Sequence, residues 1–134
     1  MSRLGAVLRV SGSRVGVQTF LDRTGWNPLS VFWKGQKRSE HSRSVSRING
    51  FNVSISDAGG LELATQVKDA VRILLSDEAE FRRLKRHKLH AVLDFGVEVK
   101  DAGGPAFFRF PSELLQLLAR YGLSLEVSYY GTQP

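Results

Sequence analysis

The chain has 134 residues, 42% of them hydrophobic, and its 19 Lys and Arg outnumber its 13 Asp and Glu to give a formal net charge of +6. This length fits one domain with an ordinary hydrophobic core, because single domains run to about 100 to 200 residues. The complete lack of cysteine excludes disulfides, cysteine-bound metal and thiol catalysis. The excess of positive charge favours an acidic partner and carries no information about the fold.

Signals for secretion and membrane insertion are missing from the sequence. The apolar stretch near the start is broken by Arg9 and by residues 11–13, whereas a signal peptide needs roughly 7 to 15 uninterrupted apolar residues. No apolar run approaches the roughly 20 residues of a membrane-spanning helix. We therefore expect residues 1–134 to form a single domain in the cytoplasm, without contact with a membrane.

The positive charge lies in the N-terminal part of the chain. Residues 1–50 hold nine bases and two acids, a sum of +7, whereas residues 51–134 hold ten bases and eleven acids. Within the first part, segment 35–47 has a single apolar residue, four serines and neither a strand nor a helix period. Such a composition predicts a mobile basic loop.

Apolar periodicity predicts a strand, a helix and a strand before this loop. Residues 6–10 alternate in character as a strand does, and Ser13 is positioned to cap a helix that runs to about Thr24. Gly25 follows as the stop of that helix. Residues 29–34 then predict a second strand.

After the loop, residues 51–56 alternate between apolar and polar, which predicts a half-buried strand. Apolar residues at helical spacing predict one helix over 63–74 and a second, short helix from about Glu78. The cleanest alternation of the chain covers 89–99 and predicts a long strand with Phe95 on its core side.

A hairpin is predicted next. The turn-forming sequence 101–105 precedes apolar residues at 107–110, which predicts a strand paired with the preceding one. Ser112 is positioned to cap a helix that Gly122 closes. Residues 123–130 alternate as a final strand.

These elements predict an α+β fold. From about residue 51 onward the order is strand, helix, strand, strand, helix, strand, which is the split βαβ arrangement of ferredoxin-like domains. The first fifty residues add an N-terminal βαβ extension to this core. Because the strands alternate polar with apolar residues, one face of the sheet carries the helices and the other stays open. We expect a two-layer sandwich with a mainly antiparallel sheet and its helices on one face.

The open face of the predicted sheet is the first candidate site. Its mixed charges suit recognition of another protein, and aromatic residues on a wet face are typical of contacts. The alternative interpretation is a merely solvated face of an antiparallel sheet. The residues predicted to bind a partner are Arg9, Phe107, Arg109, Glu126 and Tyr130.

The basic segment around the loop is the second candidate site. An exposed Trp beside several cations can stack on a base while the cations neutralise phosphates. The alternatives are a solvated loop and a buried Trp33, because Trp33 alternates in phase with Leu29 and Val31. The residues of this nucleic-acid hypothesis are Trp33, Lys34, Lys37, Arg38, Arg43 and Arg47.

A second basic run, residues 82–88, follows Asp77, Glu78 and Glu80 within one short predicted helix. Acids at the start of a helix and bases at its end complement the helix dipole. This run is therefore better explained by helix stability than by nucleic-acid binding.

Signals for catalysis and for metal binding are nearly absent. His87 and His90 straddle a helix end and a strand start with no third ligand at a suitable spacing. The sequence has no nucleophile elbow, phosphate-binding glycine loop or dinucleotide fingerprint. Asp94 and Glu98 lie four residues apart on one strand face, roughly 13 Å by strand rise, too far apart for glycoside hydrolysis. We expect no enzyme activity, no cofactor and no metal.

Three segments carry a resemblance to a known family. The opening strand Ala6–Gly12, the Trp33-Lys34-Gly35 step and the ending Leu114–Tyr130 resemble the bacterial domain of unknown function family 4279, over roughly residues 5–131. Phe51 departs from the family, where Trp is common, and residues 11–14 lack the acids often seen after the first strand. The resemblance implies a two-layer α/β fold in a bacterial cytoplasm. Families of this size and architecture include many immunity proteins of toxin systems.

The sequence thus predicts a non-enzymatic bacterial protein-binding module. Its most specific form is an immunity protein that neutralises an acidic toxin by occlusion. The alternative, from another class, is a nucleic-acid-binding protein that uses the basic loop, and an uncharacterised enzyme is the third hypothesis.

Overall fold

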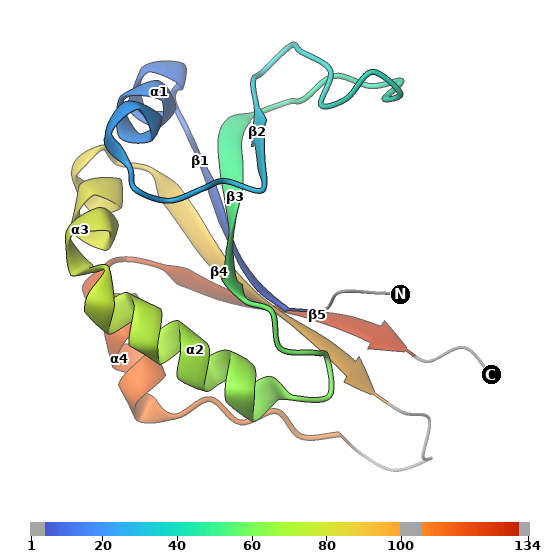
Figure 1. Cartoon of the computed structure of the whole chain (residues 1–134), viewed down its shortest axis with the longest axis vertical. Helices are drawn as coiled ribbons and strands as arrows, with labels where there is room; N and C mark the ends of the chain where they lie inside the picture. The colour runs from blue at the N-terminus through green and yellow to red at the C-terminus, as the bar shows by residue number, and fades with distance from the viewer. Residues whose placement is uncertain (1–4, 100–105, 132–134) are drawn as a thin grey trace.

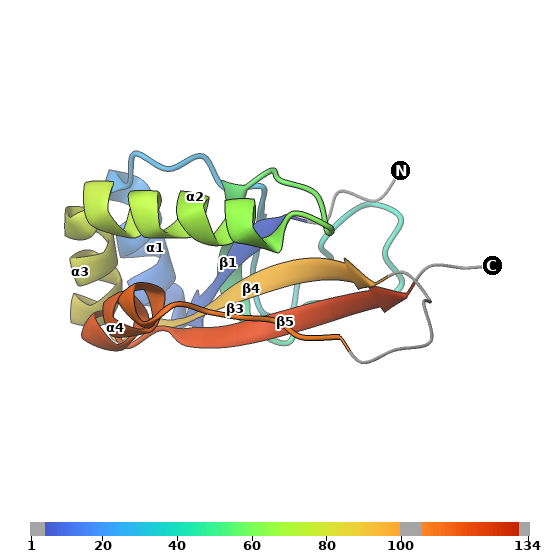
Figure 2. The same ribbon diagram turned by 90° about the horizontal axis from the view of Figure 1, so that it is seen from below.

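The computed structural model describes residues 5–99 and 106–131, which form a sheet and a layer of helices (Figures 1 and 2). The elements follow the predicted order up to residue 99. Their bounds are β1 Ala6–Gly12, α1 Arg14–Arg23, β2 Ser30–Phe32, β3 Asn49–Ser56, α2 Leu63–Ser76, α3 Glu78–Arg86, β4 His90–Val99, α4 Ser112–Arg120 and β5 Ser124–Gly131.

The five strands form one mixed sheet in the order β2-β3-β1-β4-β5. β1 is antiparallel to β3 and β4, β2 is antiparallel to β3, and β4 is parallel to β5. The unit β1-α1-β2 therefore encloses β3, and the unit β3-α2-α3-β4 encloses β1, so two split βαβ units are interleaved. The ferredoxin-like core spans β1 to β4, and α4 and β5 extend it at the opposite edge from β2 (Figure 1).

The hairpin predicted after β4 is wrong. Residues 106–111 contain no strand, and the predicted turn at 101–105 lies outside the described residues. Both sides of β4 are already paired, with β1 and with β5, so no ladder is open to this segment. Instead Phe110 places its ring 5.2 Å from that of Phe95 in the core. The split βαβ core consequently begins at β1 and not at residue 51, and the extension is C-terminal instead of N-terminal.

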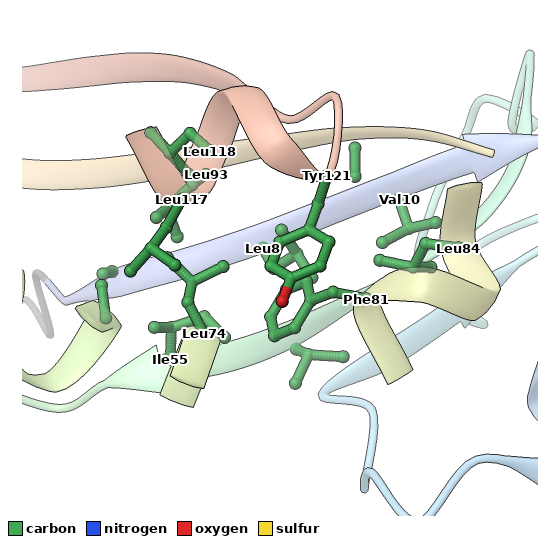
Figure 3. Packing of buried hydrophobic residues seen from close by; sticks show 14 of the residues in the cluster. Leu8, Val10, Ile55, Leu74, Phe81, Leu84, Leu93, Leu117, Leu118 and Tyr121 are labelled. Atoms are coloured by element: carbon green, nitrogen blue, oxygen red, sulfur yellow. The ribbon is translucent and has the colours of Figure 1, made fainter. Parts of the chain in front are cut away.

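The predicted two-layer α+β sandwich is confirmed. Side chains from all four helices share one core cluster with the apolar face of β1, β3 and β4. Leu8, Leu93 and Phe95 are at most 2% exposed, as the alternation of these strands predicted. Burial of each side chain of this size stabilises the folded state by about 1.5 to 3 kcal/mol. Figure 3 shows Phe81 of α3 and Tyr121 at the end of α4 meeting above Leu8, with their rings 5.6 Å apart.

The predicted N-cap is correct for α1 and wrong for α4. Ser13 caps α1 as expected, because its hydroxyl oxygen accepts a hydrogen bond of 3.0 Å from the backbone N–H of Gly16. Ser112 is not the cap of α4. Pro111 holds the extended conformation of the N-cap, and Ser112 is already the first helical residue. A proline side chain cannot accept a hydrogen bond, so α4 begins without a side-chain cap.

A buried glutamine joins α2 to the sheet. The Nε2 of Gln66 donates to the carbonyl oxygens of Ala58, Gly59 and Gly96 at 3.3, 3.0 and 2.8 Å. Gln66 is fully buried, and its Oε1 has no partner among the described residues. These bonds fasten the turn before α2 to the middle of β4.

Candidate functional site

The face of the sheet opposite the helices carries three polar rows that cross the strands. Residues directly opposite each other in neighbouring strands point to the same face, so the strand register defines each row. The rows are Ser30-Asn52-Arg9-Val92-Ser124, Phe32-Gly50-Ser11-His90 and Ser54-Val7-Asp94-Glu126. Of the five predicted partner-binding residues, this open face contains Arg9, Glu126 and Tyr130.

Asp94 is the organising residue at the centre of the open face. The Nε and Nη2 of Arg9 donate to its Oδ2 at 3.2 and 3.0 Å, and the hydroxyl of Ser128 lies 2.7 and 2.9 Å from its two carboxylate oxygens. Arg9 and Ser128 cover the carboxylate so well that Asp94 is only 4% exposed, although none of the described helices covers this face. The guanidinium of Arg9 is thereby held in one orientation while about half of the side chain stays exposed.

The edge strand β2 buries Phe32 on the open face. Leu29 and Val31, which the alternation placed on a buried face, are 63% and 41% exposed, whereas Phe32 is 6% exposed. The reason lies in the neighbouring strand, where Phe32 stands opposite Gly50. A Cβ atom on Gly50 would lie 2.8 Å from the Phe32 ring, so the ring occupies the space that a side chain would need, an aromatic covering of a strand glycine.

The basic loop folds back onto this face through Arg38. The guanidinium carbon of Arg38 lies 4.2 Å from the centroid of the Phe32 ring, within the range of a cation–π interaction. Backbone hydrogen bonds join the two sides of the loop, from Gly35 N–H to the Ser46 carbonyl and from Ser46 N–H to the Gln36 carbonyl, both at 2.8 Å. The mobility of segment 35–47 stays a prediction.

A hollow of about 280 Å³ lies between Arg38 and the middle of the sheet. Arg9, Arg38 and His90 are among the residues that line it. Among the described residues, no acidic side chain lines the hollow. The remaining side chains that line it are the polar Ser11 and Asn52 and the apolar Phe32, Ile48 and Val92.

The other end of the open face is acidic and aromatic. Glu126 is exposed on β5, and Glu98 stands opposite Tyr130 in the β4 and β5 ladder. Tyr130 is 47% exposed. The open face therefore presents cations toward β2 and carboxylates with a tyrosine toward β5.

Two predicted partner-binding residues do not lie on the open face. Phe107 and Arg109 belong to the connection that leads into α4, and this connection packs on the core side through Phe110. Both are exposed, Phe107 at 87%. Their predicted place on the sheet was wrong because the strand that would have carried them does not form.

The residues of the nucleic-acid hypothesis differ in exposure: the five cations are exposed, whereas the tryptophan is partly buried. Trp33 is partly buried against the core, as the alternative interpretation had it, and the guanidinium carbon of Arg14 lies 4.8 Å from its ring centroid. The loop cations, by which we mean Lys34, Lys37, Arg38, Arg43 and Arg47, are all exposed. None of them belongs to an ion pair within the described part of the chain.

Two arginines of the basic run form ion pairs within α3, which agrees with a role in helix stability. Arg82 pairs with Glu78, and Arg83 pairs with Glu80 at 3.1 Å. The structure adds a cation that the sequence did not place there, because Arg120 at the end of α4 lies beside Lys85, whose Nζ donates to the Arg120 carbonyl oxygen at 3.4 Å. These cations lie at the carboxyl ends of two helices, where positive charge complements the dipole.

Within residues 5–99 and 106–131, no group of three His, Asp or Glu side chains is placed to hold a metal ion. His90 is exposed and His87 is half-buried. The helices described here are also too short or too polar for any of them to cross a membrane.

Comparison with known proteins identifies the family of the chain. No curated protein and no solved structure matches it. Residues 2–132, nearly the whole chain, match the family described as Domain of unknown function (DUF4279). The sequence resemblance is thus confirmed over the full sheet, its helices and the open face, and the chain belongs to the DUF4279 family.

Proposed function

We propose that this protein is a non-enzymatic protein-binding module that covers part of an acidic partner with the open face of its sheet. The observation that carries the proposal is the hollow lined by Arg9 and Arg38 and, among the described residues, by no acidic side chain, on a face that no described helix covers. Asp94 holds the guanidinium of Arg9 there. A side chain already held in its binding orientation loses less entropy when a partner binds, so preorganisation increases affinity. Arginine and tyrosine are also the residues that most often dominate interface energies.

The most specific form of this proposal is an immunity protein that blocks a bacterial toxin by occlusion. Occlusion needs shape and charge but no reacting group, which agrees with the lack of a recognisable catalytic motif in the sequence. The net charge of +6 would accelerate encounter with an acidic toxin by electrostatic steering. Support for the toxin itself comes from analogy with other small α+β domains, whereas support for an acidic partner comes from the residues of the open face.

The alternative function, nucleic-acid binding through the loop, is favoured by one observation. A hollow of about 450 Å³ inside the loop is lined by Arg38, Arg47 and three serines. Such a hollow suits phosphate oxygens, but Trp33 is partly buried, which reduces the ring surface on which a base could stack. We therefore rank this function second.

The test is purification of the tagged protein from its native host at moderate salt, with three single variants in parallel. Arg9→Ala and Tyr130→Ala alter the two ends of the open face. Arg72→Ala is the matched control, because Arg72 is an exposed arginine of α2 on the helical side. We expect a stoichiometric partner that the control retains and the two face variants lose. A partner that both face variants retain would refute the proposal, and a bound small molecule that the protein chemically alters would refute its non-enzymatic character.

A further inference from the structure

The hollow on the open face has the features of a carboxylate pocket, beginning with the orientation of Arg9. Both of the hydrogen bonds from Arg9 to Asp94 end on the same oxygen, Oδ2, and use Nε and one terminal nitrogen. The other terminal nitrogen, Nη1, makes no hydrogen bond to any described residue. A guanidinium has five N–H donors in a planar fork, so Arg9 retains donors for a second acceptor while Asp94 fixes its plane.

Arg38, a residue of the basic loop, is the second arginine that lines the hollow. Its position depends on Phe32, whose ring lies over Gly50 and is almost fully buried. No carboxylate pairs with Arg38 among the described residues. The charge of Arg9 is offset by Asp94, so the charge of Arg38 is the one left for a bound anion to neutralise.

The size of the hollow and the polarity of its wall restrict what could enter it. Small-molecule sites usually enclose about 300 to 1,000 Å³, and this hollow, at about 280 Å³, falls just below that range. Phe32, Ile48 and Val92 provide apolar wall for a short methylene stem, and Ser11 and Asn52 provide further hydrogen-bonding groups. One inserted side chain that ends in a carboxylate satisfies these conditions.

The charges on the rest of the open face indicate whether the partner is a protein or a nucleic acid. A nucleic-acid strand that placed a phosphate in the hollow and continued across the sheet toward β5 would meet the carboxylates of Glu126 and Glu98. A protein surface can place an acidic side chain in the hollow and a basic one opposite Glu126. The charge distribution of the face therefore favours a protein.

We infer that the Arg9–Arg38 hollow is an anchor pocket for a single Asp or Glu side chain of the partner protein, held between two guanidinium groups. Asp94 is a positioning residue in this pocket, because it acts only through Arg9. This inference rests on the proposed function, since it names the contact through which the open face binds its partner.

The first experiment needs no partner and uses small probes. The arginine Nε–Hε signals of the 15N-labelled protein are followed by NMR during titration with N-acetyl-aspartate methylamide, whose side chain carries its one carboxylate, with N-acetyl-asparagine methylamide as the uncharged control. We expect saturable shifts of the Arg9 and Arg38 signals with N-acetyl-aspartate methylamide, at roughly millimolar affinity, and none with N-acetyl-asparagine methylamide. The carboxylate-induced shifts should vanish in Arg38→Ala and persist in Arg72→Ala.

The second experiment measures the affinity of the purified partner for variants of the pocket. Arg9→Ala and Arg38→Ala should each weaken binding about tenfold or more, the scale of an interface hot spot. Arg9→Lys should not restore it, because an ammonium cannot reproduce the planar fork of a guanidinium. Asp94→Asn should weaken binding although the Arg9 side chain is still present, because its guanidinium is no longer held in the same orientation. Circular dichroism melting confirms that each variant is folded.

The outcomes distinguish the pocket from the proposed function. If Tyr130→Ala releases the partner but Arg9→Ala and Arg38→Ala do not, the open face binds a protein and the anchor pocket is refuted. If no variant of the face affects the partner, both proposals fail. Shifts of the two arginine signals with a short oligonucleotide but not with N-acetyl-aspartate methylamide would overturn the carboxylate assignment in favour of phosphate.

Discussion

Replacing Gly50 by alanine tests the packing that builds the hollow. An added Cβ would lie 2.1 Å from the carbonyl oxygen of Val10 and 2.8 Å from the Phe32 ring. Ordinary contact begins near 3.4 Å, so β3 would have to move more than an ångström away from β1 or lose part of its pairing with that strand. Overpacking costs typically about 1 to 3 kcal/mol, and we expect the upper end here because one of the two obstacles is backbone.

The measurement is the thermal midpoint of unfolding, followed by circular dichroism. For a chain of this length, a loss of about 3 kcal/mol corresponds to a decrease of roughly 10 °C. Gly25→Ala is the control, because no atom lies within 4 Å of a Cβ at that position, and it should change stability by less than about 1 kcal/mol.

The double variant with Phe32→Ala locates the cause of the destabilisation. Removing the ring relieves the contact at 2.8 Å but leaves the contact with the Val10 carbonyl oxygen, so stability should not return. A midpoint for Gly50→Ala within about 2 °C of the wild type would refute the reasoning, since it would show that β1 and β3 do not approach each other so closely.

Three further predictions concern the core, the buried amide and the loop. Phe95→Ala should cost about 3 to 5 kcal/mol, because Phe95 is fully buried against Phe110; an unchanged melting temperature would contradict the assigned core face. Gln66→Ala removes the amide group that donates to three carbonyl oxygens, and it should lower the free energy of unfolding by about 1 to 3 kcal/mol. The control is Gln18→Ala, on an exposed surface, which should change this free energy by no more than about 0.5 kcal/mol. Wild-type protein should show no micromolar binding to single-stranded DNA at about 150 mM salt; clear binding that is lost when the five loop cations become alanine, with a shallower salt slope, would promote the nucleic-acid function.

Elements with a local signal could be predicted from the order of residues. The alternation in β1, β3 and β4 and the helical spacing in α1, α2 and α3 predicted both where these elements lie and which side of each is buried. Each pattern repeats over several residues within one segment, so no distant partner is needed to recognise it. The capping of α1 by Ser13 and the charge pattern of α3 are local for the same reason. The absence of cysteine is a property of the amino-acid composition, and the N-terminal excess of positive charge is a property of the order of residues along the chain.

The choice of neighbouring strands could not be predicted from local patterns. Strand pairing depends on residues far apart in sequence, and the two sides of β4 could have been occupied by different partners. Because β1 and β5 occupy them, residues 107–110 form no strand, and Phe107 and Arg109 do not lie on the open face as predicted. For the same reason, the ferredoxin-like core comprises β1 to β4 instead of beginning at residue 51 as predicted.

The candidate site was only partly visible in the sequence because its contacts cross the sheet. Arg9, Glu126 and Tyr130 were predicted on the open face from alternation, but the contact between Arg9 and Asp94 spans 85 positions. Phe32 was missed because β2 is only three residues long, too short for alternation to define its phase. What decided that phase was Gly50, a residue without a side chain in the adjacent strand. Local periodicity thus determined which residues face outward, and the register between strands determined which of them meet.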